Sequence, residues 1–244
     1  MSSRSSKRNK SAHGIRLLRL VDEYLPNTSV DIIFDVGANK GQSLKRYLRH
    51  YPRARVLSFE AGAEAFAELS RKYGKKGRAG LHKLALSDSS GWAQMASAEA
   101  LPGNRITQAT RRACAPDKDA GAWVPMEAGD DFCRRQGIDH INLLKVDTEG
   151  HDLHVLDGFS SMLSKSAIDI VQVEAGLSHT NKKHVYFVDL INHMVAYEYL
   201  PFCIFDQALE RDGSPALRRA NIAFLSASAR EANTIPENKL AKVR

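Results

Sequence analysis

The chain has 244 residues, of which 43% are hydrophobic and 26% charged, a composition typical of a globular protein with one sizeable core. No stretch approaches the ~18 consecutive apolar residues of a membrane-spanning helix, and no apolar signal-peptide core follows the first residues. The net charge of +7 belongs to the two ends, because residues 1–20 contain six basic and no acidic side chains and residues 227–244 carry +2, whereas residues 21–226 carry −1.

We therefore expect three parts: a basic, flexible leader at 1–20, a single domain at 21–226 and a C-terminal tail at 227–244. A basic leader can touch phosphates, but the domain shows no stripe of aromatic and basic residues for nucleic acid. The three cysteines, Cys114, Cys133 and Cys203, are odd in number and far apart. We expect neither disulfides nor a zinc knuckle, and hence a reducing compartment such as the cytoplasm.

Strand and helix patterns alternate along the domain. Short β-rich runs predict strands at 31–36, 54–60, 80–87, 140–147 and 167–174, and two more near 199–205 and 220–226. Apolar residues with the spacing of one helical face predict helices within 40–51, 63–73, 153–163 and 184–197. This alternation predicts an α/β fold in which helices cover both faces of a mostly parallel sheet.

Residues 92–125 do not follow this alternation. The stretch contains three prolines and two glycines at positions 102, 103, 116, 121 and 125, and it has no clear hydrophobic period. We predict an irregular loop or partly ordered insertion over the carboxyl edge of the sheet, where such loops often carry function.

The segment DVGANKGQS, residues 35–43, joins the first expected strand to the first expected helix. Gly37 and Gly41 let the backbone approach a ligand closely and present amide groups at a helix start. The pattern lacks Gly-Lys-Ser/Thr, which excludes a P-loop for nucleoside triphosphates. Asn39 stands where a dinucleotide-binding turn has its second glycine, which argues against a dehydrogenase that uses NAD.

Two acidic residues narrow the choice of ligand. Asp35 ends the first strand, where a carboxylate repels a pyrophosphate but attracts the ammonium group of a methionine-type ligand. Glu60 ends the second strand, where a carboxylate accepts hydrogen bonds from both ribose hydroxyls. The alternative is that both acids only cap the helices that follow them. Taken together, the two residues favour S-adenosylmethionine.

Five segments in series resemble the FkbM-type methyltransferase family. They are FDVGANKGQSL, VLSFEAGAEAFAEL, LALSDSSGWAQM, DHINLLKVDTEGHDLHVLDGF and IVQVEAG, and the resemblance spans residues 30–226. It implies a class I, Rossmann-like fold with a seven-stranded sheet whose last strand is antiparallel. It also implies methyl transfer from S-adenosylmethionine, usually to an oxygen of a sugar or natural-product scaffold.

The resemblance also implies which residues bind the cofactor. Those for the methionine end are Asp35, Gly37, Ala38, Asn39, Gly41, Gln42 and Ser43. Glu60 holds the ribose, and Ala61 follows it where the family usually has proline. Ala85 and Leu86, with Ser87, border the adenine.

The segment KVDTEGHD, residues 145–152, ends the fourth expected strand, beside the first, where an acceptor must lie to meet a sulfonium methyl group. Methyl transfer needs alignment of donor and acceptor, and a hydroxyl acceptor must also lose its proton. Asp147, Glu149 and His151 are the candidate catalytic residues, with His151 or a carboxylate as the general base.

Two other interpretations of these acids stay open. In one, Asp147 and Glu174, which ends the fifth strand, bind Mg²⁺, and the metal acidifies the acceptor hydroxyl. In the other, Asp147 and Glu149 only cap the helix that begins near His151.

The sequence thus predicts an S-adenosylmethionine-dependent O-methyltransferase that acts on a hydroxyl of a saccharide, glycolipid or natural-product acceptor. Two alternatives belong to other classes. One is an RNA or protein methyltransferase recruited by the basic leader, and the other is a non-catalytic binding module that keeps the same fold.

Overall fold

The computed structural model describes residues 15–95, 106–111, 123–178, 181 and 183–235. Its main sheet has the order β11-β12-β9-β8-β1-β2-β3, and the short β10 (Val185–Tyr186) pairs with β9. The strands on this path are β1 (Ile32–Val36), β2 (Arg55–Phe59), β3 (Ala79–His82), β8 (Ile141–Val146), β9 (Ile168–Gly176), β11 (Leu200–Leu209) and β12 (Leu217–Leu225). β12 is antiparallel to both neighbours and the other pairs are parallel, which confirms the predicted α/β sheet with an antiparallel last strand.

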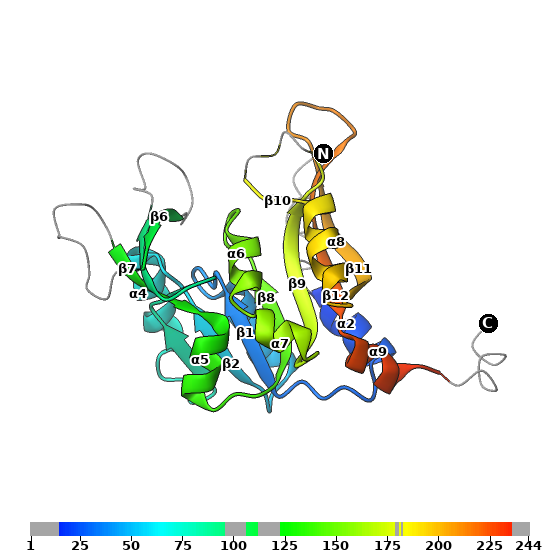
Figure 1. Cartoon of the computed structure of the whole chain (residues 1–244), viewed down its shortest axis with the longest axis horizontal. Helices are drawn as coiled ribbons and strands as arrows, with labels where there is room; N and C mark the ends of the chain where they lie inside the picture. Colours follow the sequence, from blue (N-terminus) through cyan, green and yellow to red (C-terminus); the bar gives the residue numbers. More distant parts are fainter. Residues whose placement is uncertain (1–14, 96–105, 112–122, 179–180, 182, 236–244) are drawn as a thin grey trace, which may run out of the picture.

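Helices cover both faces of this sheet (Figure 1). On one face are α5 (Gly129–Gln136), α6 (Asp152–Asp157), α7 (Ser160–Ser164) and α8 (Phe187–Ala196), and on the other are α2 (Ile15–Tyr24), α3 (Gln42–His50) and α4 (Ala63–Tyr73). Successive strand residues point to opposite faces, so Ile33 packs with the second group and Phe34 with the first. Burial on both faces explains why the strands are apolar along their length. In the part of the chain that is described, no helix is long and apolar enough to cross a membrane.

Both ends of the domain extend further than predicted. Helix α2 includes Leu17 and Leu18, which are fully buried, so the prediction of a flexible leader was wrong for residues 15–20. Helix α9 (Ala227–Asn233) occupies the start of the predicted tail and is capped by the Ser226 hydroxyl, which accepts a hydrogen bond from the Ala229 amide at 3.1 Å. Charge alone set the predicted boundary at residue 20, although the apolar face of α2 continues across it. Residues 1–14 of the leader and 236–244 of the tail lie outside the described residues.

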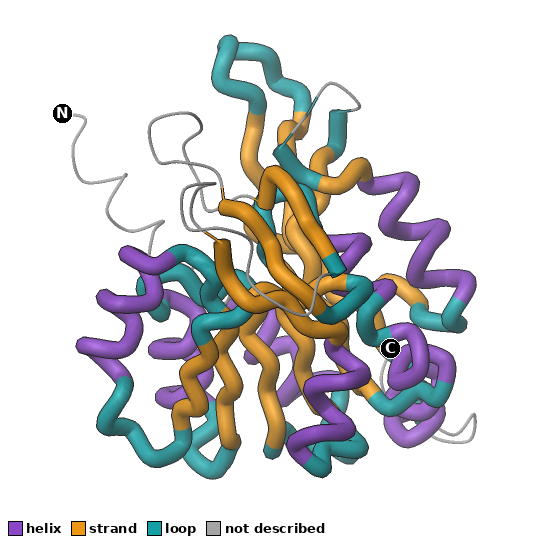
Figure 2. The backbone as a smooth tube through the Cα atoms, turned by 60° about the vertical axis from the view of Figure 1, so that its left-hand side comes forward, coloured by secondary structure: helices purple, strands orange, loops and turns teal. Residues whose placement is uncertain are grey.

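The stretch predicted as an irregular loop supplies most of a second sheet (Figure 2). Its order is β4-β7-β5-β6, with β4 (Ala85–Ser87), β7 (Trp123–Ala128), β5 (Gly91–Met95) and β6 (Ile106–Thr110). The prediction of an irregular loop was therefore wrong for β5, β6 and β7, and the alternative of a partly ordered insertion fits them better. Ala93, Val124 and Met126 of the second sheet form a small core of their own. The expected strand at 80–87 is also divided, since β3 belongs to the main sheet and β4 to the second. The remaining parts of 92–125 lie outside the described residues.

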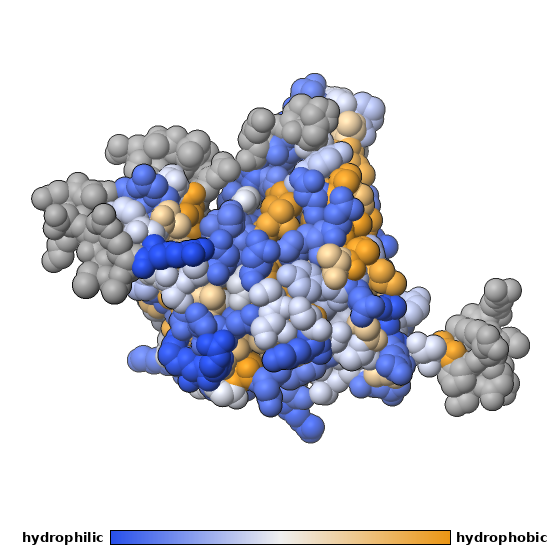
Figure 3. Space-filling view, viewed as in Figure 1, coloured by the Kyte–Doolittle hydropathy of each residue, from blue (hydrophilic) through white to orange (hydrophobic). Residues whose placement is uncertain are grey.

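The edge of the main sheet that ends in β11 carries apolar surface. Figure 3 shows apolar side chains along the region of α8 and β11. Val188 and Val195 of α8 and Leu200 and Ile204 of β11 are all exposed. This surface lies at the opposite end of the strand order from β3.

Candidate active site

A cavity of about 340 Å³ opens at the carboxyl end of the main sheet, which is within the usual size range of small-molecule sites. It lies between the β1–α3 turn, the end of β8 and the second sheet. Most residues predicted to bind a cofactor line it, namely Gly37, Ala38, Asn39, Gln42, Ser43, Glu60, Ala61, Ala85 and Leu86. Asp35 and Gly41 are not among the lining residues.

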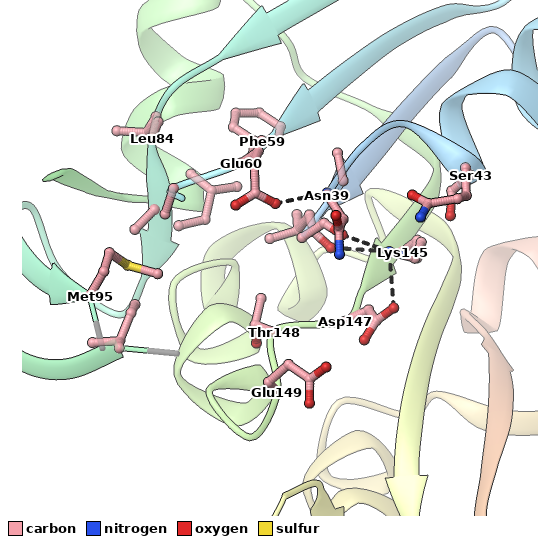
Figure 4. A pocket seen from close by; sticks show the side chains of 18 of the residues that line it. Asn39, Ser43, Phe59, Glu60, Leu84, Met95, Lys145, Asp147, Thr148 and Glu149 are labelled. Carbon is pink, nitrogen blue, oxygen red and sulfur yellow. Dashed lines mark hydrogen bonds and ion pairs between the residues drawn. The ribbon is translucent and has the colours of Figure 1, made fainter. Parts of the chain in front are cut away.

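The cavity has an apolar end and a polar end (Figure 4). Leu84 and Met95, which precede and follow the Ala85–Leu86 pair, line the apolar end. Lys145 and Asp147 line the polar end, where β8 stops. Glu60 lies between the two ends. The cavity is therefore suited to a ligand with one apolar part and one charged part.

Glu60 is held in place by backbone amides. Its side chain is buried, Oε2 accepts a hydrogen bond from the Asn39 amide at 2.7 Å, and Oε1 accepts one from the Gly62 amide at 2.7 Å. These bonds join the ends of β1 and β2 through one carboxylate. The two amide bonds therefore fix the orientation of the Glu60 carboxylate at the edge of the cavity.

The two glycines of the β1–α3 turn have different roles. Gly37 has φ of +73°, and a β-carbon there would overlap the backbone carbonyl of Asp147, so glycine lets the turn touch the end of β8. Gly41 has φ of +86°, and a β-carbon would lie 2.5 Å from the Tyr73 ring and 2.8 Å from Leu69. Gly41 thus makes room for helix α4. The expectation that it brings the backbone close to a ligand was wrong.

A buried ion pair lies beneath the polar end of the cavity. The ammonium of Lys145 is 3.1 Å from Oδ1 of Asp35 and 3.5 Å from Oδ2 of Asp147. Burial alone would lower the pKa of Lys145, but the two carboxylates outweigh it and raise that pKa, so the side chain is cationic. Asp35 is fully buried and faces Lys145 instead of the cavity. The predicted direct attraction between Asp35 and a cationic ligand is therefore not supported.

Asp147 and Glu149 both line the cavity and do not cap helix α6. His151 is the N-cap residue and makes no capping hydrogen bond through its side chain. The turn is closed by Asp152, whose Oδ1 accepts bonds from the amide of Thr148 at 2.8 Å and from its hydroxyl at 2.7 Å. Glu149 has φ of +56° and pairs with Lys183 at 2.8 Å. The capping interpretation was thus wrong, and both acids remain candidates for chemistry.

His151 does not line the cavity. Its Nε2 is 2.8 Å from the hydroxyl of Ser87, and its ring stacks on His154 with 4.6 Å between centroids. Burial, with a smaller contribution from His154, lowers the pKa of His151 to about 4. His151 is not among the residues that line the cavity, so the structure does not bring it together with Asp147 and Glu149.

The geometry does not fit the predicted magnesium site. Glu174 pairs with His184 Nε2 at 2.8 Å and also with Arg219, so two basic side chains occupy its carboxylate. Across the described ranges, no group of three or more His, Cys, Asp or Glu side chains is placed to hold a metal ion. The hypothesis that Asp147 and Glu174 share a metal was wrong, because Glu174 already pairs with His184 and Arg219.

Several lining residues were missed from the sequence. They are Val36, Arg46, Phe59, Leu84, Met95, Ile106, Lys145 and Thr148. Lys145 had a recognisable signal, since it is a lysine inside the otherwise apolar run INLLKV. Met95 and Ile106 belong to the stretch that was predicted to be irregular, so their position on a sheet could not be anticipated.

A family model and two curated proteins match the sequence of this chain. A sequence model described as the methyltransferase FkbM domain matches residues 35–201. The chain is 25% identical over 150 residues to the 2-O-methyltransferase NoeI of Sinorhizobium fredii (strain NBRC 101917 / NGR234), covering 55% of this chain and 60% of that protein. It is 31% identical over 153 residues to the methyltransferase sdnD of Sordaria araneosa, covering 52% and 59%. The alignments thus span less than two thirds of each curated relative.

Solved structures match over most of the chain at low sequence identity. TrmK of M. capricolum, in complex with S-adenosyl-homocysteine, matches with a TM-score of 0.47 and 10% identity, covering 88% of this chain and 69% of that one. The cyclase SpnF matches with a TM-score of 0.48 and 10% identity, covering 86% and 80%.

Proposed function

Because this chain belongs to the FkbM methyltransferase family, we propose that it is an S-adenosylmethionine-dependent O-methyltransferase acting on a hydroxyl of a saccharide, glycolipid or natural-product acceptor. The observation that carries the proposal is the order of groups along the cavity. An apolar end, a buried carboxylate and a charged end follow one another, as the adenine, ribose and amino-acid parts do in this cofactor.

The residues present fit the cofactor in three places. Leu86, Met95 and Ile106 form the apolar walls that an adenine ring needs. Glu60 is oriented by backbone amides and accepts hydrogen bonds from ribose hydroxyls. Gln42 and Ser43 at the start of α3, together with the charged groups of the polar end, serve the amino-acid part. When bound, the cofactor supplies a methyl group on a positively charged sulfur.

Asp147 is the residue we assign as general base. Its carboxylate lines the polar end, its side chain is 40% exposed, and Lys145 holds it at 3.5 Å. A carboxylate in that place would take the proton of an acceptor hydroxyl as the methyl carbon passes from sulfur to the hydroxyl oxygen. It also complements the positive charge of a sulfonium group. The likeness to NoeI, a 2-O-methyltransferase, supports oxygen as the accepting atom.

The cofactor assignment is tested by isothermal titration calorimetry of the full chain with S-adenosylhomocysteine and, separately, with NAD⁺. We expect binding of the first and no heat from the second. If the chain bound NAD⁺ and did not bind S-adenosylhomocysteine, the proposal would be overturned.

The acceptor class is tested with S-adenosylmethionine that carries a radiolabelled methyl group. Methyl β-D-glucopyranoside, methyl α-D-mannopyranoside and bulk tRNA serve as probes. We expect label on a glycoside, and label on tRNA alone would favour the RNA methyltransferase. A chain that binds S-adenosylhomocysteine and labels no probe behaves as the non-catalytic module.

The base is tested by Asp147→Asn, which should lower kcat by about 10²–10⁴-fold while S-adenosylhomocysteine still binds. Asp189→Asn is the matched control, because Asp189 is exposed on α8 and is not among the lining residues. Equal kcat values for the two variants would show that Asp147 is not the base.

A further inference from the structure

Lys145 is a buried cation in the centre of the main sheet, and its surroundings are apolar on the side away from the cavity. It stands in register with Asp35 of β1 and Gln172 of β9, so these three side chains point to the same face. Two residues earlier on the same strands, the corresponding row is Ile33, Leu143 and Ile170, all of which are buried in the core. The sheet therefore changes from apolar to charged at the row that adjoins the cavity.

This arrangement is costly for the fold. A buried ion pair gains little over a pair of well-packed apolar side chains, because both charges lose their hydration. The neighbouring row of Ile33 and Leu143 shows that the same two strands pair well with apolar residues. A charged pair kept at such a position, beside a cavity, points to a role at the site.

The contacts of Lys145 define that role. Its ammonium lies 3.1 Å from Oδ1 of Asp35, 3.3 Å from the carbonyl oxygen of Gly37 and 3.5 Å from Oδ2 of Asp147. One cation thus joins the end of β1, the first residue of the turn and the carboxylate at the end of β8 (Figure 4). Among the described residues, it is the side chain placed to orient the Asp147 carboxylate.

We propose that Lys145 is a positioning residue that holds the Asp147 carboxylate at the polar end of the cavity and against the β1–α3 turn. This inference rests on the proposed function, in which Asp147 takes the acceptor proton. The carboxylate of Asp35 holds the ammonium of Lys145, and this ammonium in turn holds the carboxylate of Asp147. Methyl transfer is sensitive to such placement, because a displacement of 1 Å in a reacting group costs about 10²-fold in rate.

Lys145→Met tests the inference but leaves Asp35 as an unpaired buried charge, which itself destabilises the fold. The double variant Asp35→Asn/Lys145→Met removes both charges and separates folding from positioning. Lys183→Met is the matched control, because Lys183 pairs with Glu149, another carboxylate of the cavity, from an exposed position. Crystal structures of the full chain with S-adenosylhomocysteine, and kcat and KM with the glycoside that accepts methyl groups, are the measurements.

In the double variant we expect the Asp147 carboxylate to leave its place beside the turn. We also expect kcat to fall by about 10²-fold, with a much smaller change in KM. In Lys183→Met, Asp147 should stay in place. Two results would contradict the inference: Asp147 keeps its position in the double variant, or the double variant has the kcat of the wild type. Either result would mean that Lys145 only neutralises Asp35.

Failure of the proposed function gives a different result. In that case the wild-type chain does not bind S-adenosylhomocysteine, whereas the position of Asp147 in crystals of the wild type and the double variant still decides the role of Lys145.

Discussion

Gly37 and Asp147 come from turns after two neighbouring strands, β1 and β8, and their backbones are in contact. A β-carbon on residue 37 would overlap the carbonyl oxygen of Asp147 and lie 2.9 Å from its carbonyl carbon. The contact sets the distance between the proposed cofactor turn and the proposed base. One backbone contact thus places the proposed cofactor turn and the proposed base relative to each other.

Gly37→Ala should weaken both the fold and the site. The new β-carbon meets backbone that cannot move aside, and φ of +73° is strained for alanine, which costs about 1–3 kcal/mol. We expect a lower Tm and weaker binding of S-adenosylhomocysteine by calorimetry. Gly77→Ala is the control, since a β-carbon there has no described neighbour within 4 Å. Unchanged binding in Gly37→Ala would contradict the importance of this contact.

Glu60→Gln should reduce the affinity for S-adenosylhomocysteine. The side chain loses the charge that strengthens its hydrogen bonds from two backbone amides and from ribose hydroxyls, and bonds to a charged group contribute about 1.5–3 kcal/mol. The expected loss is about 10- to 100-fold in Kd, by calorimetry. Glu64→Gln, at an exposed position on α4, should leave Kd unchanged. Equal Kd values for the two variants would show that Glu60 does not contact the ligand.

Ile106→Asp should also weaken this binding, because it places a charge in the apolar end of the cavity. Ile106 lines the cavity from β6, whereas Gln108 of the same strand is exposed and does not line it. Gln108→Asp is therefore the matched control and should bind like the wild type. If both variants bind normally, the second sheet does not form the wall for adenine.

Leu17→Ala should destabilise the whole domain. Leu17 belongs to α2 and is completely buried in the core. Removing a buried leucine side chain costs about 2–5 kcal/mol. Urea unfolding measures the change in the free energy of unfolding. Arg19→Ala, exposed on the same helix, should change it by less than about 0.5 kcal/mol. If this segment did not belong to the fold, Leu17→Ala and Arg19→Ala would give identical unfolding curves.

His151 should make the domain less stable in acid. Burial lowers its folded pKa to about 4 from the usual 6.5, so the unfolded chain binds a proton below pH 6.5 that the folded chain does not. The free energy of unfolding therefore falls as the pH drops from 6.5 towards 4, by at most about 2 kcal/mol at pH 5. His151→Gln removes this contribution. Urea unfolding at pH 7 and pH 5 should show a smaller loss in the variant than in the wild type, and equal losses would refute the assignment.

The positions of the strands and of the turn were predictable because their signals are local. DVGANKGQS contains its own strand end, turn glycines and helix start, and hydrophobic periodicity marks most of the other elements. The carboxyl ends of parallel strands meet at one edge, so the sequence alone predicted that Glu60 and Asp147 lie near the turn. The pairing of the second sheet escaped prediction because its strands are short and because long segments separate β5, β6 and β7.

The sequence by itself therefore determined the family, the alternation of strands and helices and most residues around the cavity. Only the tertiary structure decided which charges face one another. The register of β1 against β8 turns Asp35 towards Lys145, and the register of β9 against β12 places Arg219 near Glu174, where the two pair. Partners of this kind are set by strand pairing between distant segments, and a one-residue shift would turn each side chain to the other face. Local sequence does not specify that register, and for this reason the metal hypothesis failed while the position of Glu60 in the cavity was predicted.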